Sequence, residues 1–284
     1  MSSGDSARPP RFESQSRFDP ADPLGAAAGT PLVVIPARYS SSRFPAKPLA
    51  DLNGKPMVQH VWERAVSAKR PGRVLVATDD DRIADVVRGF GGEVQMTSSS
   101  HRTGTERVAE VASRFSSRIV VNLQGDLPLF DPATLDLLIE KSEQLILQGE
   151  TDLVTAKSEI YSEEEVFSPH SVKVVTDWKG RALYFSRSPL PYLEKGSFGK
   201  GSAPFKFFKH YGIYLYHSDF LSRIAKSPEG NLERMERLEQ LRVLEQGGRV
   251  QVVEIDRAAA RFFWEVNTPE DLVKAKEILS SLEK

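Results

Sequence analysis

Short apolar runs alternate with stretches of helical periodicity from Pro31 onward. The apolar runs predict buried strands at 32–35, 74–77 and 119–123 and a shorter strand at 93–96. Between and after them, apolar residues recur at helical spacing, which predicts helices over 57–67, 80–90, from about 105, and from 131 to about 148. Strands that are apolar on both faces and alternate with helices are typical of a three-layer α/β fold with a mixed, mostly parallel sheet.

The second half of the chain has a less regular pattern. Residues 172–176 and 182–185 flank a turn and predict a hairpin, and 211–216 predicts another strand. The remaining predicted elements are a helix over 232–246 that stops at Gly247, a strand over 250–255, and a final helix over 269–282 with Thr268 as N-cap. No internal repeat or linker interrupts residues 31–284, which we expect to form one domain.

Residues 1–30 differ from the rest in composition. They hold five Ser, five Ala, four Pro and three Gly, with few large apolar side chains. Such a segment buries too little surface to offset the entropy of ordering it, so we expect a disordered tail. A transit peptide is the alternative, although the acidic residues in the segment argue against one.

Composition and charge narrow the class of protein. The 284 residues carry 38 Lys and Arg against 39 Asp and Glu, a net charge of -1, which lacks the basic excess of a nucleic-acid-binding protein. The absence of cysteine excludes disulfides, thiolate metal sites and thiol nucleophiles. No apolar stretch is long enough to insert into a membrane, so we expect a cytoplasmic enzyme.

The loop after the first strand carries the strongest chemical signal. It contains Arg38, Arg43 and Lys47 together with three serines, beginning at Pro36 and Ala37. Guanidinium and ammonium groups are the donors that a polyphosphate requires, and ligands bind beyond the carboxyl ends of parallel strands. An ordinary solvated basic loop remains the alternative.

A second signal follows the strand 119–123, where Gln124, Gly125 and Asp126 precede a proline. A carboxylate at this edge can hold Mg²⁺ against nucleotide phosphates, Gly125 lets the backbone approach closely, and the Gln124 amide can bind a polyol. A common turn explains the same residues on their own.

Weaker signals lie elsewhere. Thr103, Gly104, Thr105 and Arg107 open a helix, where backbone N–H groups suit an anion or a base edge, with Thr105 as a possible N-cap. Four isolated polar residues are candidates for substrate contacts, each with a structural alternative: Arg187, His210, Glu239 and Gln240.

Taken together, the motifs resemble those of the 3-deoxy-manno-octulosonate cytidylyltransferases. The resemblance runs from about Leu32 to the C-terminus and rests on segments that occur in the same order: IPARY at 35–39, KPL at 47–49, NGKPM at 53–57, ATD at 77–79, GTER at 104–107, QGD at 124–126, ALYFSR at 182–187, HYGIY at 210–214, LEQLR at 238–242 and TPEDL at 268–272.

The resemblance implies a nucleotide-diphospho-sugar transferase fold and a homodimer with a small antiparallel dimerisation subregion. It implies transfer of CMP from CTP to the anomeric 2-hydroxyl of a 3-deoxy-2-ulosonic acid, such as Kdo or its 8-amino analogue, with release of pyrophosphate, in lipopolysaccharide precursor synthesis. Arg38 and Lys47 are expected to hold the phosphates, with the segment 103–107 near the cytosine. The residues expected to contact the sugar acid are Gln124, Arg187, His210, Glu239 and Gln240.

The resemblance also implies a Mg²⁺ cofactor, held by Asp126 and by the residue at position 267. The family usually has Asp there, whereas this chain has Asn267, whose amide contributes no negative charge. The family usually has Gly at position 46, where this chain has Ala46. It usually has a polar residue at position 127, where this chain has Leu127, and we expect that position to lie beside the sugar pocket. These departures leave open a weakened paralogue that binds nucleotide or sugar acid, and a same-fold nucleotidyltransferase with another acceptor or nucleotide.

Overall fold

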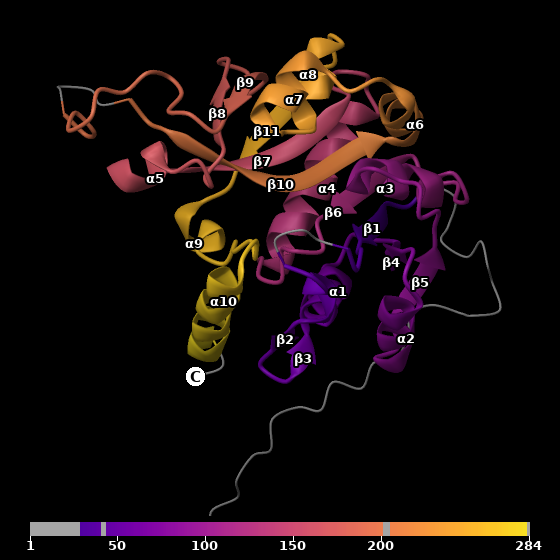
Figure 1. Ribbon diagram of the computed structural model, residues 1–284. Helices are drawn as coiled ribbons and strands as arrows, with labels where there is room; N and C mark the ends of the chain where they lie inside the picture. Colours follow the sequence, from indigo (N-terminus) through magenta and orange to yellow (C-terminus); the bar gives the residue numbers. More distant parts are fainter. Residues whose placement is uncertain (1–28, 41–43, 201–204, 283–284) are drawn as a thin grey trace, which may run out of the picture.

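The computed structural model describes residues 29–40, 44–200 and 205–282. The predicted tail up to residue 28, and Arg43 in the basic loop, lie outside the described residues. A mixed sheet forms the centre of the molecule (Figure 1). Its strands follow the order β11 (Val250–Glu254), β7 (Leu153–Glu159), β10 (Phe208–His217), β6 (Ile119–Leu123), β1 (Leu32–Pro36), β4 (Arg73–Thr78) and β5 (Glu93–Met96).

Strand direction in this sheet is uniform except at β10. The pairs β1–β4, β1–β6, β4–β5 and β7–β11 are parallel, whereas β10 runs antiparallel to both β6 and β7. A second antiparallel pair, β8 (Lys173–Thr176) and β9 (Ala182–Ser186), joins the sheet through β10. The predicted α/β class with a mostly parallel sheet is confirmed, as is the hairpin around Gly180.

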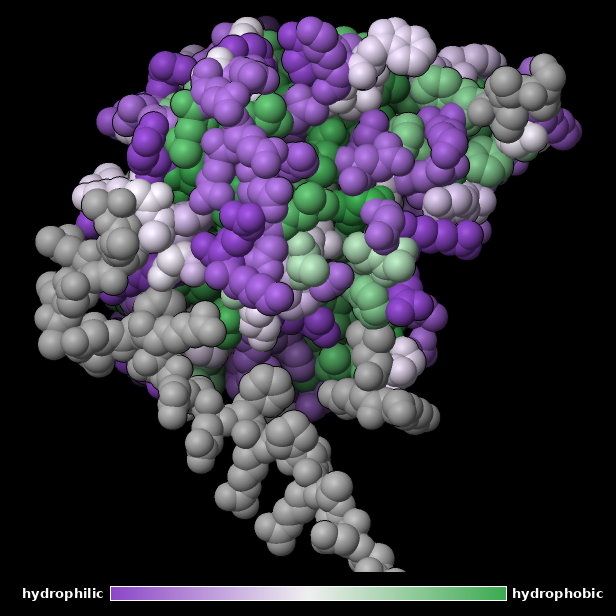
Figure 2. All heavy atoms as spheres, turned by 180° about the vertical axis from the view of Figure 1, so that it is seen from behind, coloured by the Kyte–Doolittle hydropathy of each residue, from purple (hydrophilic) through white to green (hydrophobic). Residues whose placement is uncertain are grey.

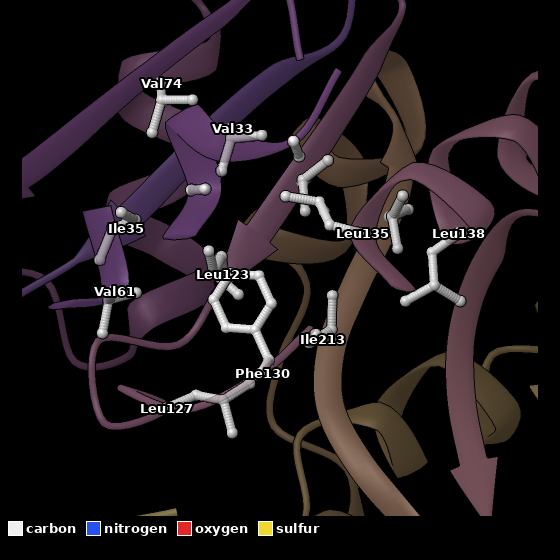
Figure 3. Close-up of a cluster of buried hydrophobic side chains, with 14 of the residues drawn as sticks. Val33, Ile35, Val61, Val74, Leu123, Leu127, Phe130, Leu135, Leu138 and Ile213 are labelled. Atoms are coloured by element: carbon white, nitrogen blue, oxygen red, sulfur yellow. The ribbon is translucent and has the colours of Figure 1, made fainter. Parts of the chain in front are cut away.

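Alternate residues of β1 enter two different cores, which explains why this strand is a continuous apolar run. Val33 and Ile35 pack in a cluster with side chains of the helices on one face of the sheet. Figure 3 shows part of this cluster. Leu32 and Val34 pack in a second cluster on the opposite face. Side chains that alternate across a strand bury both faces only when helices cover both.

Helices therefore lie on both faces of the sheet. The first core packs against α1 (Met57–Ser67), α2 (Asp81–Gly89) and α4 (Pro132–Ile146). The second packs against α3 (Gly104–Ala112), α6 (Ser218–Lys226) and α8 (Gln240–Glu245). The predicted first-half helices are thus confirmed within a few residues at their ends.

The C-terminal helix α10 (Pro269–Leu282) packs beside a small hairpin of β2 (Asp51–Leu52) and β3 (Lys55–Pro56) (Figure 1). A third apolar cluster joins them through Leu52, Val266 and Ala275. The hairpin turns at Asn53 and Gly54, whose φ angles of 52° and 83° match the tight turn that Asn-Gly favours. It is a small antiparallel unit outside the main sheet, whereas the dimerisation role expected of such a unit stays a prediction.

The prediction of one helix over 232–246 is wrong. The chain forms α7 (Asn231–Glu236), reverses at Arg237 with φ at 56°, and resumes as α8. The Glu245 carboxylate of α8 accepts the backbone N–H of Leu232 at 3.0 Å, and Arg242 forms an ion pair with Glu233 of α7. These contacts hold the two short helices side by side, a tertiary arrangement that periodicity does not reveal.

Several elements are absent from the prediction. They are β2, β3, β7, α6 and two short helices, α5 (Glu163–Phe167) and α9 (Arg257–Ala260), together with the short 3₁₀ turn η1 (Lys47–Leu49). Strand β7 is buried although Thr155, Lys157 and Ser158 lie along it, so its polar sequence hid it. Buried polar side chains are tolerated there because each has a hydrogen-bond partner.

The outer surface is mixed. Figure 2 shows hydrophilic residues over much of the face turned away in Figure 1, with smaller hydrophobic areas between them. Among the helices that the structure describes, none has the length and apolar character required to cross a lipid bilayer.

Candidate active site

An open pocket lies where β1 and β6 end and α3 begins, the edge that the parallel strands predict. It gathers residues that are far apart in the sequence: Pro36, Ala37, Arg38, Lys47, Pro48, His101, Arg102, Thr103, Gly104, Arg107, Gln124, Gly125, Asp126 and Glu239. Four of these side chains are permanently cationic and two are carboxylates, so the lining carries a positive excess. Such a lining favours an anion with several charges.

The basic loop enters the pocket from β1. Arg38 is exposed, and its guanidinium donates to the carbonyl oxygen of Arg102 at 3.5 Å. Ala46 precedes η1 with φ at 55°, a left-handed conformation that favours glycine. Lys47 follows this turn directly and lines the pocket.

Lys47 connects the basic loop to Asp126. Its Nζ donates to Asp126 Oδ2 at 2.8 Å and to the carbonyl oxygen of Val266 at 3.0 Å. The two side chains are 16% and 27% exposed, so both remain accessible from the pocket. A cation and a carboxylate therefore already occupy the position that we predicted for phosphate and metal binding.

Gly125 is needed for a close approach of two strands' ends. A Cβ at this position would lie 2.7 Å from the carbonyl oxygen of Pro36. The β6 end therefore packs directly on the β1 end, which places Asp126 beside the basic loop. The sequence indicated a close backbone contact at Gly125, and its partner is the protein's own chain.

Helix α3 begins at the pocket, with a different N-cap from the one considered. The Thr103 hydroxyl, not Thr105, accepts the backbone N–H of Glu106 at 3.2 Å. Arg107 is buried and forms an ion pair with Asp79 at 3.1 Å while its guanidinium also donates to the Thr97 hydroxyl. Its guanidinium is thus fixed at the pocket wall.

Thr105 points inward to Glu239, which lies in the turn before α8. The Thr105 hydroxyl donates to Glu239 Oε2 at 2.5 Å. Burial raises the pKa of Glu239 above its ordinary value, while the hydrogen bond from Thr105 and the charge of Arg242 oppose the rise. Glu239 is the residue that links the second half of the chain to this pocket.

The other three predicted sugar contacts do not line this pocket. Arg187 donates to the carbonyl oxygens of Pro169 and Glu236, both at 2.9 Å. His210 is buried against Thr155, and burial lowers its pKa to about 3, so the ring is neutral near pH 7. Gln240 accepts the Tyr214 hydroxyl at 3.1 Å, and its amide nitrogen is buried without a partner.

His210 and Gln240 are joined through aromatic rings. The His210 ring contacts Phe185 at a centroid distance of 4.9 Å and Tyr214 at 5.6 Å, and the Tyr214 hydroxyl reaches Gln240. We call the set His210, Tyr214 and Gln240 the buried polar network and include in it the half-buried Arg187, which follows the strand that carries Phe185. Its side chains are engaged with the protein rather than presented to the pocket.

The predicted second metal ligand, Asn267, follows a strand-like segment that pairs with the Asp126 turn. The Val266 N–H donates to the Asp126 carbonyl at 2.8 Å. The Asn267 and Thr268 N–H groups both donate to Asp271 at 2.9 Å, and Thr268 in turn caps α10 as predicted. Position 267 is therefore adjacent to Asp126 through the backbone.

Leu127 lies elsewhere than expected. It is 1% exposed and packs in the first core with Leu123 and Phe130 (Figure 3). It does not line the pocket, so an apolar side chain at this position supports packing. His101, which pairs with Glu110, and Arg102 also line the pocket, although neither was among the predicted site residues. Both lie directly before the predicted helix start at 103–107, so their position in the sequence could have indicated them.

The donors around Asp126 fit Mg²⁺ rather than a soft metal. The candidate ligands are oxygens, namely the Asp126 carboxylate and the Val266 carbonyl, both of which accept hydrogen bonds from Lys47. The described part of the chain contains no cluster of three or more His, Asp or Glu residues suited to a metal. Mg²⁺ is compatible with this, since it is commonly held by one or two carboxylates plus substrate phosphates.

Comparisons with known proteins agree with the motifs. A family model described as Cytidylyltransferase matches residues 32–255. The 3-deoxy-manno-octulosonate cytidylyltransferase of Geobacter sulfurreducens is 51% identical over 87% of this chain and 98% of its own length. That of Syntrophotalea carbinolica is 48% identical over 88% of this chain and 98% of its own.

A solved structure is similar along most of the chain. It is a CMP:2-keto-3-deoxy-manno-octonic acid synthetase complexed with CTP, with a TM-score of 0.80 and 38% identity over 89% of this chain and all of the other. The family model covers the chain from β1 to the end of β11, and the relatives and the solved structure each cover 87–89% of it. The chain therefore belongs to the family of 3-deoxy-manno-octulosonate cytidylyltransferases, and it is a nucleotidyltransferase.

Proposed function

We propose that the protein joins CMP from CTP to the anomeric 2-hydroxyl of Kdo and releases pyrophosphate. The observation that carries this proposal is the cationic pocket at the carboxyl ends of β1 and β6, where Arg38, Lys47 and Arg107 come together. A relative of known structure is complexed with CTP, and a relative with 51% sequence identity is named 3-deoxy-manno-octulosonate cytidylyltransferase. The family resemblance further favours a cytoplasmic role in lipopolysaccharide precursor synthesis.

The reaction balances as an in-line displacement. The 2-hydroxyl oxygen of the sugar acid forms a bond to the α-phosphorus of CTP and gives up its proton to water. The bond from that phosphorus to the bridging oxygen breaks, and pyrophosphate leaves. Positioning and charge neutralisation carry most of the catalysis in such reactions. Arg38 and Lys47 supply positive charge to the phosphates, and the start of α3 supplies backbone N–H groups and the fixed Arg107 guanidinium.

Mg²⁺ is part of the proposal, with Asp126 as its protein carboxylate. When bound, the metal supplies further neutralisation of the triphosphate charge. Lys47 pairs with the same carboxylate at 2.8 Å, so ammonium and carboxylate neutralise each other before nucleotide arrives. Both groups are then available for opposite partners, the ammonium for phosphate and the carboxylate for cation.

The acceptor side is proposed from the buried polar network together with Gln124 and Glu239. Arg187 is suited to the carboxylate of a sugar acid, because a guanidinium forms paired hydrogen bonds with carboxylates. In this structure its donors are taken by two carbonyls. We therefore propose that acceptor binding exchanges these carbonyl contacts for contacts with the sugar acid.

A homodimer is also proposed. Large apolar side chains are exposed on the β8–β9 hairpin and on α7, including Leu183, which is 62% exposed, and Met235, which is 81% exposed. β9 and the α7–α8 pair lie close together in Figure 1. A second copy of the chain would cover these side chains, and sedimentation velocity of wild type against Leu183→Glu with Met235→Glu tests this.

The reaction is tested by measuring pyrophosphate release from CTP with Kdo, with its 8-amino analogue and with other ulosonic acids. Release with Kdo above all others is expected, with CTP preferred over the other three nucleoside triphosphates. Folded protein without release across the acceptor panel would contradict the proposal. A preference for another nucleotide would instead show a same-fold nucleotidyltransferase of different specificity.

Asn267 favours a second candidate, a weakened paralogue that binds nucleotide with little turnover. CTP binding by calorimetry with negligible pyrophosphate release, and recovery of release in Asn267→Asp, would establish that alternative.

A further inference from the structure

Two neighbouring carboxylates in the turn after β4 each orient an arginine. Asp79 forms the ion pair at 3.1 Å that fixes the Arg107 guanidinium in the pocket wall. Asp80, the next residue, accepts two hydrogen bonds from the Arg82 guanidinium, at 2.9 Å and 2.6 Å. Neither carboxylate is among the described residues that line the pocket. The turn therefore acts on the pocket through other side chains, and Asp80 acts through Arg82.

Arg82 lies over the ring of Tyr39, which directly follows Arg38 in the basic loop. Its guanidinium carbon is 3.3 Å from the centre of the ring. A guanidinium this close to the face of an aromatic ring is attracted by the quadrupole of the ring. Asp80 also caps α2 by accepting the backbone N–H of Arg82 at 3.0 Å. Arg82 is thus held by the same carboxylate at its backbone and at its side chain.

Tyr39 connects the two cationic residues that the basic loop brings to the pocket. Its carbonyl oxygen accepts the backbone N–H of Ala46 at 3.0 Å. Arg38 precedes Tyr39 and Lys47 follows Ala46, and both cationic residues line the pocket. The Tyr39 side chain is half-buried and packs against the first core. The position of Tyr39 therefore affects Arg38 and Lys47 together.

We propose that Arg82 and Tyr39 are positioning residues for the nucleotide: the Arg82 guanidinium, oriented by Asp80, holds the Tyr39 ring where Arg38 and Lys47 meet the triphosphate. This rests on the proposed function, in which CTP binds at these two cationic residues. Neither Arg82 nor Tyr39 is among the described pocket-lining residues, so both act through their neighbours. Arg82, whose side chain is 61% exposed on α2, thereby contributes to nucleotide affinity from outside the pocket.

The test measures nucleotide binding by isothermal titration calorimetry, with CTP added to the full-length protein in the presence of Mg²⁺ and without sugar acid. Arg82→Met removes the guanidinium and Tyr39→Leu removes the ring, and we expect each to raise the Kd for CTP about two- to fivefold. The conservative variant Tyr39→Phe keeps the ring and should recover the affinity that Tyr39→Leu loses. The KM for the sugar acid at saturating CTP should be the same in all of these variants, because the contact acts on the basic loop alone.

A control and a double variant separate the ring contact from a simple loss of charge. Arg88→Met, on the same helix, removes a guanidinium that is 54% exposed and paired with Asp85, and it should leave the Kd for CTP unchanged. If Arg82 acts through Tyr39, Arg82→Met combined with Tyr39→Leu should bind CTP no more weakly than either single variant, since both remove one contact. Thermal melts confirm that each variant is folded.

Four results would overturn the proposal. Equal losses of CTP affinity in Arg82→Met and Arg88→Met would show an effect of net charge alone. Effects of Arg82→Met and Tyr39→Leu that multiply in the double variant would show that the two residues act independently. Wild-type CTP affinity in both single variants would remove them from nucleotide binding while the proposed function stands. A wild type that binds no CTP would contradict the proposed function itself, and this inference with it.

Discussion

The pocket at the ends of β1 and β6 and the buried polar network differ in how their side chains are engaged. In the pocket, Arg38 is exposed, and Lys47 and Asp126 are accessible and paired with each other. In the network, Arg187, His210 and Gln240 are bonded to carbonyls, hydroxyls and rings of the protein itself. Under the proposed function, the nucleotide side is thus formed in advance, whereas the acceptor side exchanges internal contacts for a ligand.

The largest expected effect comes from the pocket. Lys47→Met removes the ammonium that bridges Asp126 and Val266, and we expect kcat/KM for pyrophosphate release to fall about 100- to 1,000-fold. Lys55→Met, which removes an ammonium paired with Glu63 outside the pocket, is the control and should change it little. Equal activities in the two variants would remove Lys47 from the mechanism.

The network predicts a pH effect on stability through His210. Its pKa is lowered from 6.5 to about 3 in the folded protein, so the unfolded chain takes up the proton first as the pH falls. The stability that the neutral ring contributes is therefore complete above about pH 6.5 and is lost as the pH falls towards 3.

Between pH 7 and pH 5 the loss from this group is about 2 kcal/mol. Urea unfolding of wild type and His210→Gln at both pH values checks it, since other titrating groups contribute equally to both proteins. A wild type that loses no more stability than His210→Gln would show that the ring is protonated or solvated in the folded state.

A smaller effect is expected on KM, and it should differ between the two substrates. Arg187→Lys keeps the charge but loses the planar fork, so we expect KM for the sugar acid to rise about tenfold while KM for CTP stays unchanged. Arg181→Lys on the same hairpin, exposed and paired with Asp177, serves as the control. A rise in KM for CTP instead would place Arg187 on the nucleotide side.

The smallest effect concerns the loop that carries Lys47. Ala46 has φ at 55°, and Ala46→Gly relieves this left-handed strain, so we expect a gain in unfolding free energy of up to about 1 kcal/mol. Ala50→Gly, at φ of -59° four residues later, gains nothing by the same argument and should be neutral or destabilising. Chemical denaturation of both variants decides between them.

The first half of the molecule could be predicted from the sequence because its signals are local. The β1 run is apolar on both faces, and a parallel strand's carboxyl end predicts the position of Arg38 and Asp126 without knowledge of the rest. Gly125 was recognisable as a site of close approach for the same reason.

The second half depends on contacts between distant residues. Strand β7 was missed because Thr155 and Lys157 are buried with partners on other strands. The break at Arg237 depends on Glu245 capping α7, and no periodicity encodes that contact.

The reversed direction of β10 has a consequence for how such a protein can diversify. Gly212, midway along it, lies against Gln124 at the pocket edge, which its partner β6 reaches with its last residue. Under the proposed function, the nucleotide side is built from segments that leave strands, and part of the acceptor side from a strand that runs the other way. We therefore expect that substitutions in β10 alter acceptor choice without disturbing the nucleotide loops, so that the two specificities can evolve separately on one scaffold.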